Sequence, residues 1–221
     1  YDLSQNGRYS IEYVGLAKHG SGGASGAPLY VWLEGRNAKA PVDPTPPGGA
    51  GLSYSGNCSA SQKSTIASAV AAATSYAQGA ASYLAGTPSA TPRYTTWFGA
   101  VSTTGWNTAK AHFNAEVDAF TTKPITVDCK CRKSNIYAYV YPTKPYVIYV
   151  CGAFWAAPMT GTDSKAGTLI HEMSHFNVVA GTDDWAYGQA AAQALAISNP
   201  TNALDNADSH EYFAENTPAQ P

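Results

Sequence analysis

The spacing of apolar residues changes along the chain, and this limits the fold more than any other feature. From about residue 59 to residue 122 the spacing is helical and predicts two helices, the first opened by the capping-box pair Ser59 and Gln62. The next apolar segments are short and rich in β-branched and aromatic residues, as in strands: ITVDC, IYAYVYP and YVIYV. Helical spacing then returns in LIHEMSHF and YGQAAAQALAIS. Helices before and after a small sheet predict an α+β domain that is mainly helical.

The first fifty residues have a different pattern. Residues 1–36 are β-rich and contain two strand candidates, RYSIEYVGL and PLYVWLEGR. Two strands alone are at best marginally stable, so this segment must pack on something else or belong to a longer β unit. Residues 37–52 are rich in proline and glycine, which is typical of a linker. Residues 53–221 are predicted to form the main domain, closed by the polar tail NADSHEYFAENTPAQP.

Composition excludes several classes of protein. Hydrophobic residues make up 44% of the 221 residues, enough for one sizeable core. Only 13% are charged and the formal net charge is −2, which argues against nucleic acid or an anionic membrane as a partner. No apolar run approaches the roughly 20 residues that span a bilayer. The chain begins at Tyr1 without a signal-type stretch, so we expect a processed form, and nothing indicates an oligomer, so we expect a monomer.

Four cysteines form an even set. Cys129 and Cys131 are too close in sequence for a zinc knuckle, and we expect the two to have different partners. We therefore predict that Cys131 pairs with Cys151 across neighbouring strands and that Cys129 pairs with the distant Cys58. Two structural disulfides indicate an oxidising compartment and a secreted protein. Asn57 begins a weak glycosylation sequon.

The segment GTLIHEMSHFNVVAGTDDWAYG, residues 167–188, carries the chemistry. Its apolar residues predict a buried helix that ends at Gly181. His171 and His175 lie one turn apart on the same face and can reach one metal ion, with Glu172 close to a water on that ion. A catalytic zinc needs a third protein ligand. Asp183 and Asp184 both follow the glycine turn, and spacing alone does not choose between them.

At these residues a family resemblance appears. HEMSHF followed by GTDDWAYG resembles the signature of the aspzincin metallopeptidases, and similarity to the fungal peptidyl-Lys metalloendopeptidases extends from about Ser53 to Pro221 through TPRYTTWFG, CGAFWAAP and GTDSKAGTL. The resemblance implies a zincin-type catalytic domain. It implies that zinc is bound by His171, His175 and Asp184 and that Asp183 is variable. It also makes Glu172 the general base and Tyr187 the hydrogen-bond donor to the oxyanion.

The resemblance also implies a substrate. Asp208 and Glu211 match the acidic residues that accept a lysine ammonium in the S1′ pocket, with Thr182 close by. A compact ammonium between two carboxylates favours lysine over apolar side chains and over arginine, so we predict cleavage on the amino side of lysine. The alternative is a broad-specificity, deuterolysin-like protease. His19, His112 and His210 are expected to be surface or packing residues.

The N-terminal segment resembles the last part of the propeptide found in such enzymes, which makes the protein's own propeptide an expected partner. Lys39 in the linker then marks a possible self-cleavage point, between Ala38 and Lys39. The rival interpretation is a stable accessory hairpin. Two other hypotheses for the whole chain are a latent precursor with a blocked cleft and a non-catalytic binding protein, for instance one that binds glycans through its 15 tyrosines and 5 tryptophans.

Overall fold

The computed structural model describes residues 51–221 in full and, before them, the backbone of two short strands. The chain divides into two compact units, Tyr1–Pro44 and Thr45–Pro221. Among the residues that the structure describes, no helix is both long enough and apolar enough to cross a membrane.

The first unit contains a pair of antiparallel strands. Strand β1, Gly7–Ile11, pairs with β2, Leu29–Leu33, so that Tyr9 lies opposite Val31. Both strands overlap the segments predicted as β structure. Residues 37–50 of the predicted linker, which include the Ala38–Lys39 bond, and His19 lie outside the described residues. Leu52, the last residue of the predicted linker, instead begins a strand of the second unit.

The second unit is built on a four-stranded sheet. Its strands are β3 (Leu52–Ser55), β4 (Ile125–Asp128), β5 (Ala138–Val140) and β6 (Val147–Val150). The order is β3-β4-β6-β5, in which β3, β4 and β6 are parallel and β5 runs antiparallel to β6. Three of these strands lie in the three predicted segments, whereas β3 was not predicted. Because β5 is at the edge of this sheet, one side of its backbone pairs with no other strand of the described sheet.

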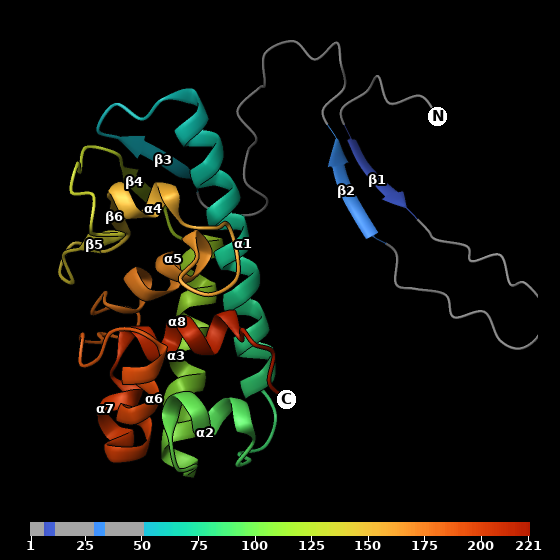
Figure 1. The fold of residues 1–221 in the computed structure, drawn as a ribbon, viewed down its shortest axis with the longest axis vertical. Helices are drawn as coiled ribbons and strands as arrows, with labels where there is room; N and C mark the ends of the chain where they lie inside the picture. Colours follow the sequence, from blue (N-terminus) through green and yellow to red (C-terminus); the bar gives the residue numbers. More distant parts are fainter. Residues whose placement is uncertain (1–6, 12–28, 34–50) are drawn as a thin grey trace, which may run out of the picture. The chain divides into compact units, whose positions relative to one another are not determined.

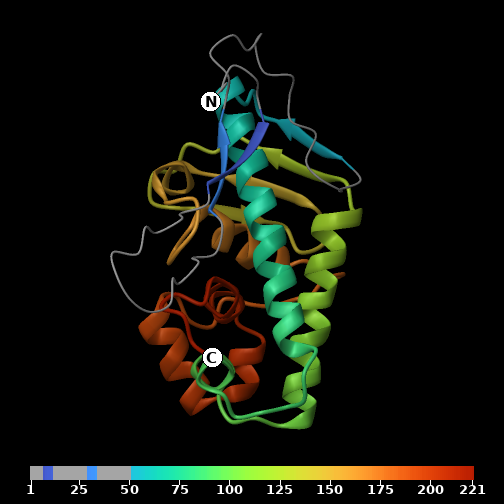
Figure 2. The same cartoon turned by 90° about the vertical axis from the view of Figure 1, so that its right-hand side faces the viewer.

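Eight helices complete the unit: α1 (Ala60–Leu84), α2 (Pro92–Phe98), α3 (Thr103–Thr122), α4 (Gly152–Ala156), α5 (Lys165–Ser174), α6 (Gln189–Ser198), α7 (Pro200–Leu204) and α8 (Ala207–Glu215). The sheet lies at one end of the unit and α2, α6 and α7 lie at the other, with α5 and α8 between them (Figure 1). Helices α1 and α3 lie side by side along its length (Figure 2). The α+β, mainly helical fold predicted from the sequence is confirmed.

Local signals account for the long helices. The capping box of α1 is present, with the Ser59 side chain accepting from the Gln62 N–H and the Gln62 side chain accepting from the Ser59 N–H. The face predicted to be apolar is buried: Ile66, Val70, Ala73, Ala77, Ala80 and Leu84. Helix α3 begins at Thr103, two residues after the predicted start, because Ser102 caps it by accepting from the Gly105 N–H.

Both predicted disulfides are present. Cys58 is bonded to Cys129, and Cys131 is bonded to Cys151. The first joins the start of α1 to the end of β4, and the second joins the loop after β4 to the end of β6. Together they fasten the loops around the sheet, and none of the four cysteines is free.

The polar tail predicted for residues 206–221 is wrong for its first part. Residues Ala207–Glu215 form α8, and every one of them is buried. The charged and polar side chains of α8 tolerate burial because they bond to other elements. The Glu215 carboxylate accepts from the N–H and the hydroxyl of Ser164, and the Tyr212 hydroxyl donates to the Asp163 carboxylate. Helix α8 therefore packs against α5 through polar as well as apolar groups.

Candidate active site

Helix α5 is held at its N-terminus by α8. The Ser164 side chain caps α5 by accepting from the Gly167 N–H, while its own hydroxyl donates to Glu215. A side chain at Gly167 would collide with Glu215 and would place its Cβ 2.8 Å from a carboxylate oxygen of Glu211. Glycine at position 167 thus lets two carboxylates of α8 approach the helix closely.

Helix α5 ends at Ser174, not at Gly181 as predicted. The chain turns earlier because Thr182 returns to the end of the helix, where its N–H donates to the Ser174 carbonyl and its hydroxyl bonds to the Ser174 hydroxyl at 2.6 Å. Gly181 adopts the positive φ of 64° expected of a turn glycine. The turn directs the chain straight back past His175, so the following loop lies beside the two histidines.

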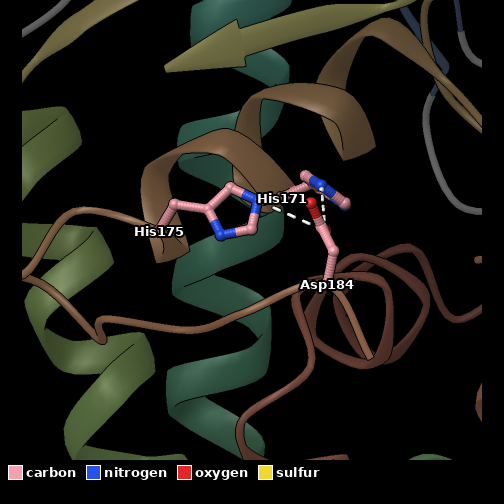
Figure 3. A group of neighbouring side chains, drawn as sticks. All are labelled: His171, His175 and Asp184. Atoms are coloured by element: carbon pink, nitrogen blue, oxygen red, sulfur yellow. Dashed lines mark ion pairs between the residues drawn. The ribbon is translucent and has the colours of Figure 1, made fainter. Parts of the chain in front are cut away.

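Three side chains converge on one point (Figure 3). Nε2 of His171 and Nε2 of His175 lie 3.2 Å and 3.4 Å from the same oxygen, Oδ1 of Asp184. Ligands that surround zinc tetrahedrally at 2.0–2.1 Å are about 3.4 Å from one another. The spacing of these donor atoms therefore fits a metal ion at their centre, and the donor set of two imidazoles and one carboxylate suits zinc.

The other ring nitrogens set the tautomers. Nδ1 of His175 lies 2.7 Å from the Thr182 carbonyl, which can only accept, so this nitrogen carries the proton. Nδ1 of His171 lies 2.7 Å from Asp208 and 3.5 Å from Glu211. With Nδ1 holding a proton in this way, each ring can offer the lone pair of Nε2 to a metal ion once one is bound. Partners of this kind fix the orientation of metal-binding histidines and raise their basicity.

The electrostatics of the cluster favour a cation. Burial lowers the pKa of His171, but the carboxylates of Asp184, Asp208 and Glu211 outweigh it and hold the pKa well above its ordinary value. Burial raises the pKa of Asp184, and its hydrogen bonds with the two imidazoles overcome that effect and hold the pKa far below its ordinary value. Negative charge is therefore concentrated where the three donor atoms meet.

Glu172 and Tyr187 flank this point on the same cleft. Glu172 is only 5% exposed, and burial raises its pKa despite the nearby histidines. Tyr187 is 67% exposed, with its ring parallel to that of His171 at 6.4 Å between centroids. Burial of its hydroxyl and the Asp184 carboxylate raise the pKa of Tyr187 to about 12, so it remains a hydrogen-bond donor.

The cleft has a volume of about 590 Å³ and continues from the cluster along strand β5 and helix α8. Glu211 lies on its wall, and burial raises the pKa of this carboxyl to about 7. Asp208 also lines the cleft, but one of its oxygens contacts His171 and the other accepts from the Gly188 N–H. Thr182 is not on the wall: it is buried behind His175.

Sequence analysis did not identify several residues of the cleft. Tyr137, Thr168 and Tyr212 line it, and so does Asp163, which accepts from the Tyr212 hydroxyl at 2.7 Å. No local pattern marks these residues, since they come from the loop before β5, from two helices and from a turn. The remaining histidines of the domain, His112 and His210, pack together with 3.0 Å between their ring nitrogens, as expected of packing residues.

Two histidines, one in a buried helix and one at its C-cap, with a glutamate between them and a carboxylate from the next loop, are an arrangement typical of metal-dependent hydrolases. The family model for lysine-specific metallo-endopeptidases, the aspzincins, matches residues 83–215. The chain belongs to the aspzincin family of metallo-endopeptidases.

Individual proteins that are similar to this chain are also named as proteases or peptidases. An extracellular protease from Aeromonas hydrophila is 47% identical over 235 aligned residues, covering 100% of this chain and 67% of that protein. A peptidyl-Lys metalloendopeptidase from Pleurotus ostreatus is 52% identical, covering 73% of this chain and 96% of that protein. A solved zinc peptidase from Grifola frondosa is 50% identical with a TM-score of 0.72, covering 74% of this chain and 100% of that structure. The chain spans 48% of a further relative, the peptidyl-Lys metalloendopeptidase of Armillaria mellea.

Proposed function

We propose that this protein is a secreted, zinc-dependent endopeptidase that hydrolyses peptide bonds on the amino side of lysine. The observation that carries the proposal is the convergence of two Nε2 atoms and one carboxylate oxygen, at distances that suit zinc, beside the buried Glu172. The site thus combines a metal position with a carboxylate that can exchange protons.

Each residue of the proposed site has a separate role. Bound by His171, His175 and Asp184, zinc supplies the Lewis-acid chemistry that makes a water molecule acidic near pH 7. The Glu172 carboxylate accepts the proton of the attacking water and passes it to the leaving amine. The Tyr187 hydroxyl donates a hydrogen bond to the carbonyl oxygen as negative charge develops on it. The raised pKa of Glu172 suits a group that must take up a proton and release it again.

Strand β5 is a suitable binding site for the backbone of an extended substrate. Residues 138–140 line the cleft, and β5 is an edge strand of the described sheet. An extended peptide can add to such an edge through main-chain hydrogen bonds. The peptide would then cross the metal cluster at the end of the cleft formed by α5 and the loop after it.

Charge supports lysine as the residue that follows the cleaved bond. Glu211 lies on the cleft wall, where its contact with a basic group is Nδ1 of His171 at 3.5 Å, and Asp208 adds negative charge beside it. Asp163 also lines this cleft. A lysine ammonium is a compact charge that carboxylates can surround. Thr182 lies behind the metal position, so we assign it the orientation of His175.

Secretion and the N-terminal segment remain part of the proposal. Two disulfides support an oxidising compartment, and the relative from Aeromonas hydrophila is named an extracellular protease. We propose that residues 1–36 are the remainder of a propeptide, joined by the linker of residues 37–52, since the Pleurotus ostreatus enzyme aligns over 96% of its own length and leaves part of this chain without a counterpart. N-terminal sequencing of incubated protein, with Glu172→Ala as control, tests cleavage before Lys39; identical starts in both would reject it.

A single set of measurements tests the activity. The purified protein should contain one zinc per chain and should cut an unstructured protein before lysine. Glu172→Gln should retain the zinc while kcat falls by about 10²–10⁴-fold, because the proton acceptor is lost. Equal cleavage before leucine or phenylalanine would instead support a deuterolysin-like protease. Zinc binding without hydrolysis in the wild type would support a binding protein or a latent precursor.

A further inference from the structure

The loop that follows α5 carries two functional side chains but has little packing of its own. Asp184 and Tyr187 both belong to it, and between residues 183 and 188 no side chain is buried. Its only regular pairing is one isolated bridge, between Asp183 and Asn206. Apolar burial therefore cannot hold this loop, and hydrogen bonds from outside must do so.

Asn206 supplies those bonds from the start of α8. It is fully buried, and its side-chain Oδ1 accepts from the N–H groups of both Trp185 and Ala186 at 2.9 Å. Its side-chain Nδ2 donates to the Ser209 hydroxyl at 3.1 Å. The two N–H groups held by Oδ1 lie in the chain between Asp184 and Tyr187, so one oxygen orients the backbone that aims both side chains.

Asn206 lies where an asparagine side chain usually caps the helix that follows it, but here the side chain bonds to the loop. Asn206 is the N-cap residue of α8, yet its side chain makes no capping hydrogen bond to that helix. Asparagine at this position normally accepts from the helix's own first N–H groups, which stabilises the helix. Here that acceptor is directed to the loop instead.

The backbone of Asn206 is itself fixed on both sides. The Asp183 N–H donates to the Asp205 carbonyl at 2.8 Å, and the Ala207 N–H donates to the Asp183 carbonyl at 3.1 Å. The Asn206 carbonyl accepts from Nδ1 of the buried His210 at 3.0 Å, and His210 is bonded in turn to His112. The amide oxygen is therefore presented to the loop from a rigid base.

We propose that Asn206 is a positioning residue for the metal site: its amide oxygen holds the Asp184 carboxylate and the Tyr187 hydroxyl in their working places. This rests on the proposed zinc-dependent function. Asn206 touches neither metal nor substrate, and it acts only through the backbone of the loop.

Asn206→Ser is the most informative variant. Serine caps a helix about as well as asparagine, so α8 should remain stable, but its shorter side chain cannot reach the loop. Zinc affinity, measured by competition with a chelator, should fall about 10–100-fold, the usual effect of losing an outer partner of a metal site. With saturating zinc, kcat should fall while KM for a lysyl substrate changes little, because Glu211 belongs to α8 and not to the loop that carries Asp184 and Tyr187. Asn206→Asp, which keeps the oxygen acceptor, should recover most of the affinity.

Trp185→Phe is the matched control. It removes a hydrogen bond of the same loop, from Nε1 of Trp185 to Asp205 at 2.9 Å, but leaves the backbone N–H groups in place. Its zinc affinity should stay within about twofold of the wild type, as for most surface substitutions. If Asn206→Ser binds zinc as tightly as the wild type, whatever its thermal stability, the inference is overturned. A wild type that binds zinc no better than His171→Ala would overturn the proposed function and this inference together.

Discussion

Helix α5 and the loop of residues 183–188 hold the two halves of the metal site in different ways. The helix is buried along its whole length, and its histidines lie one turn apart because helical geometry puts them there. The loop is exposed, and its aspartate reaches the histidines only because α8 binds the loop backbone. Local helix geometry thus places the two imidazoles, whereas partners distant in sequence place the aspartate of the loop.

Asp208 contacts both halves, so its substitution should weaken metal binding more than substitution of a residue that contacts only one half. One oxygen contacts His171 in the helix, and the other accepts from Gly188 in the loop. Asp208→Asn should weaken zinc binding by about 10–100-fold, because the imidazole loses its anionic partner. Chelator competition measures this. Asp205→Asn, which alters only the bond to the Trp185 side chain, is the control. Equal affinities in the two variants would contradict a joint dependence on Asp208.

Gly167→Ala perturbs the helix half alone. The added methyl group would collide with Glu215 and crowd Glu211, forcing α5 and α8 apart. The free energy of unfolding should fall by about 1–3 kcal/mol, as in other overpacked sites, and chemical denaturation measures it.

Gly79→Ala in α1 is the control for Gly167→Ala, since a Cβ there meets nothing within 4 Å. Its free energy of unfolding should rise by about 0.5–1 kcal/mol through helix propensity. Equal destabilisation by the two substitutions would show that helix α5 does not depend on close approach of the α8 carboxylates.

Glu116 offers a smaller test, on the scaffold behind α5. It lies on α3, fully buried, and neither carboxylate oxygen has a hydrogen-bond partner among the described residues. Burial raises its pKa well above the ordinary value, so the folded state keeps a proton that the unfolded state releases. Stability from this group is complete below the unfolded pKa of about 4.3 and falls as pH rises above it, by up to about 1.4 kcal/mol per pH unit.

Glu116→Gln should therefore flatten the decline in unfolding free energy above about pH 4.3. Denaturant titrations at several pH values measure the slope. Asp118→Asn, an exposed neighbour paired with Lys123, is the control and should leave the slope unchanged. An unaltered slope in Glu116→Gln would mean that the carboxyl is not neutral in the folded state.

The parts of the fold that were predicted correctly depend on neighbours in sequence. The capping box of α1, its apolar face and the strand segments β4 to β6 follow from patterns within a few residues. The disulfide pairing was also predicted correctly, although Cys129 and Cys131 lie in the loop beyond β4 and not on a strand. The errors concern long-range contacts. Helix α5 ends early because Thr182 returns to Ser174, and the tail becomes α8 because its polar groups find distant partners.

The sequence alone determined the two imidazoles of the proposed metal site and the glutamate between them, because helical periodicity places residues 171 and 175 on one face whatever surrounds the helix. It did not determine how the aspartate, the tyrosine and the ring of His171 are held. Those depend on hydrogen bonds between groups 20 or more residues apart, such as Gly188 with Asp208 and Trp185 with Asn206. Such contacts exist only after the core has brought α8 against α5, because a polar group finds a partner by proximity in space.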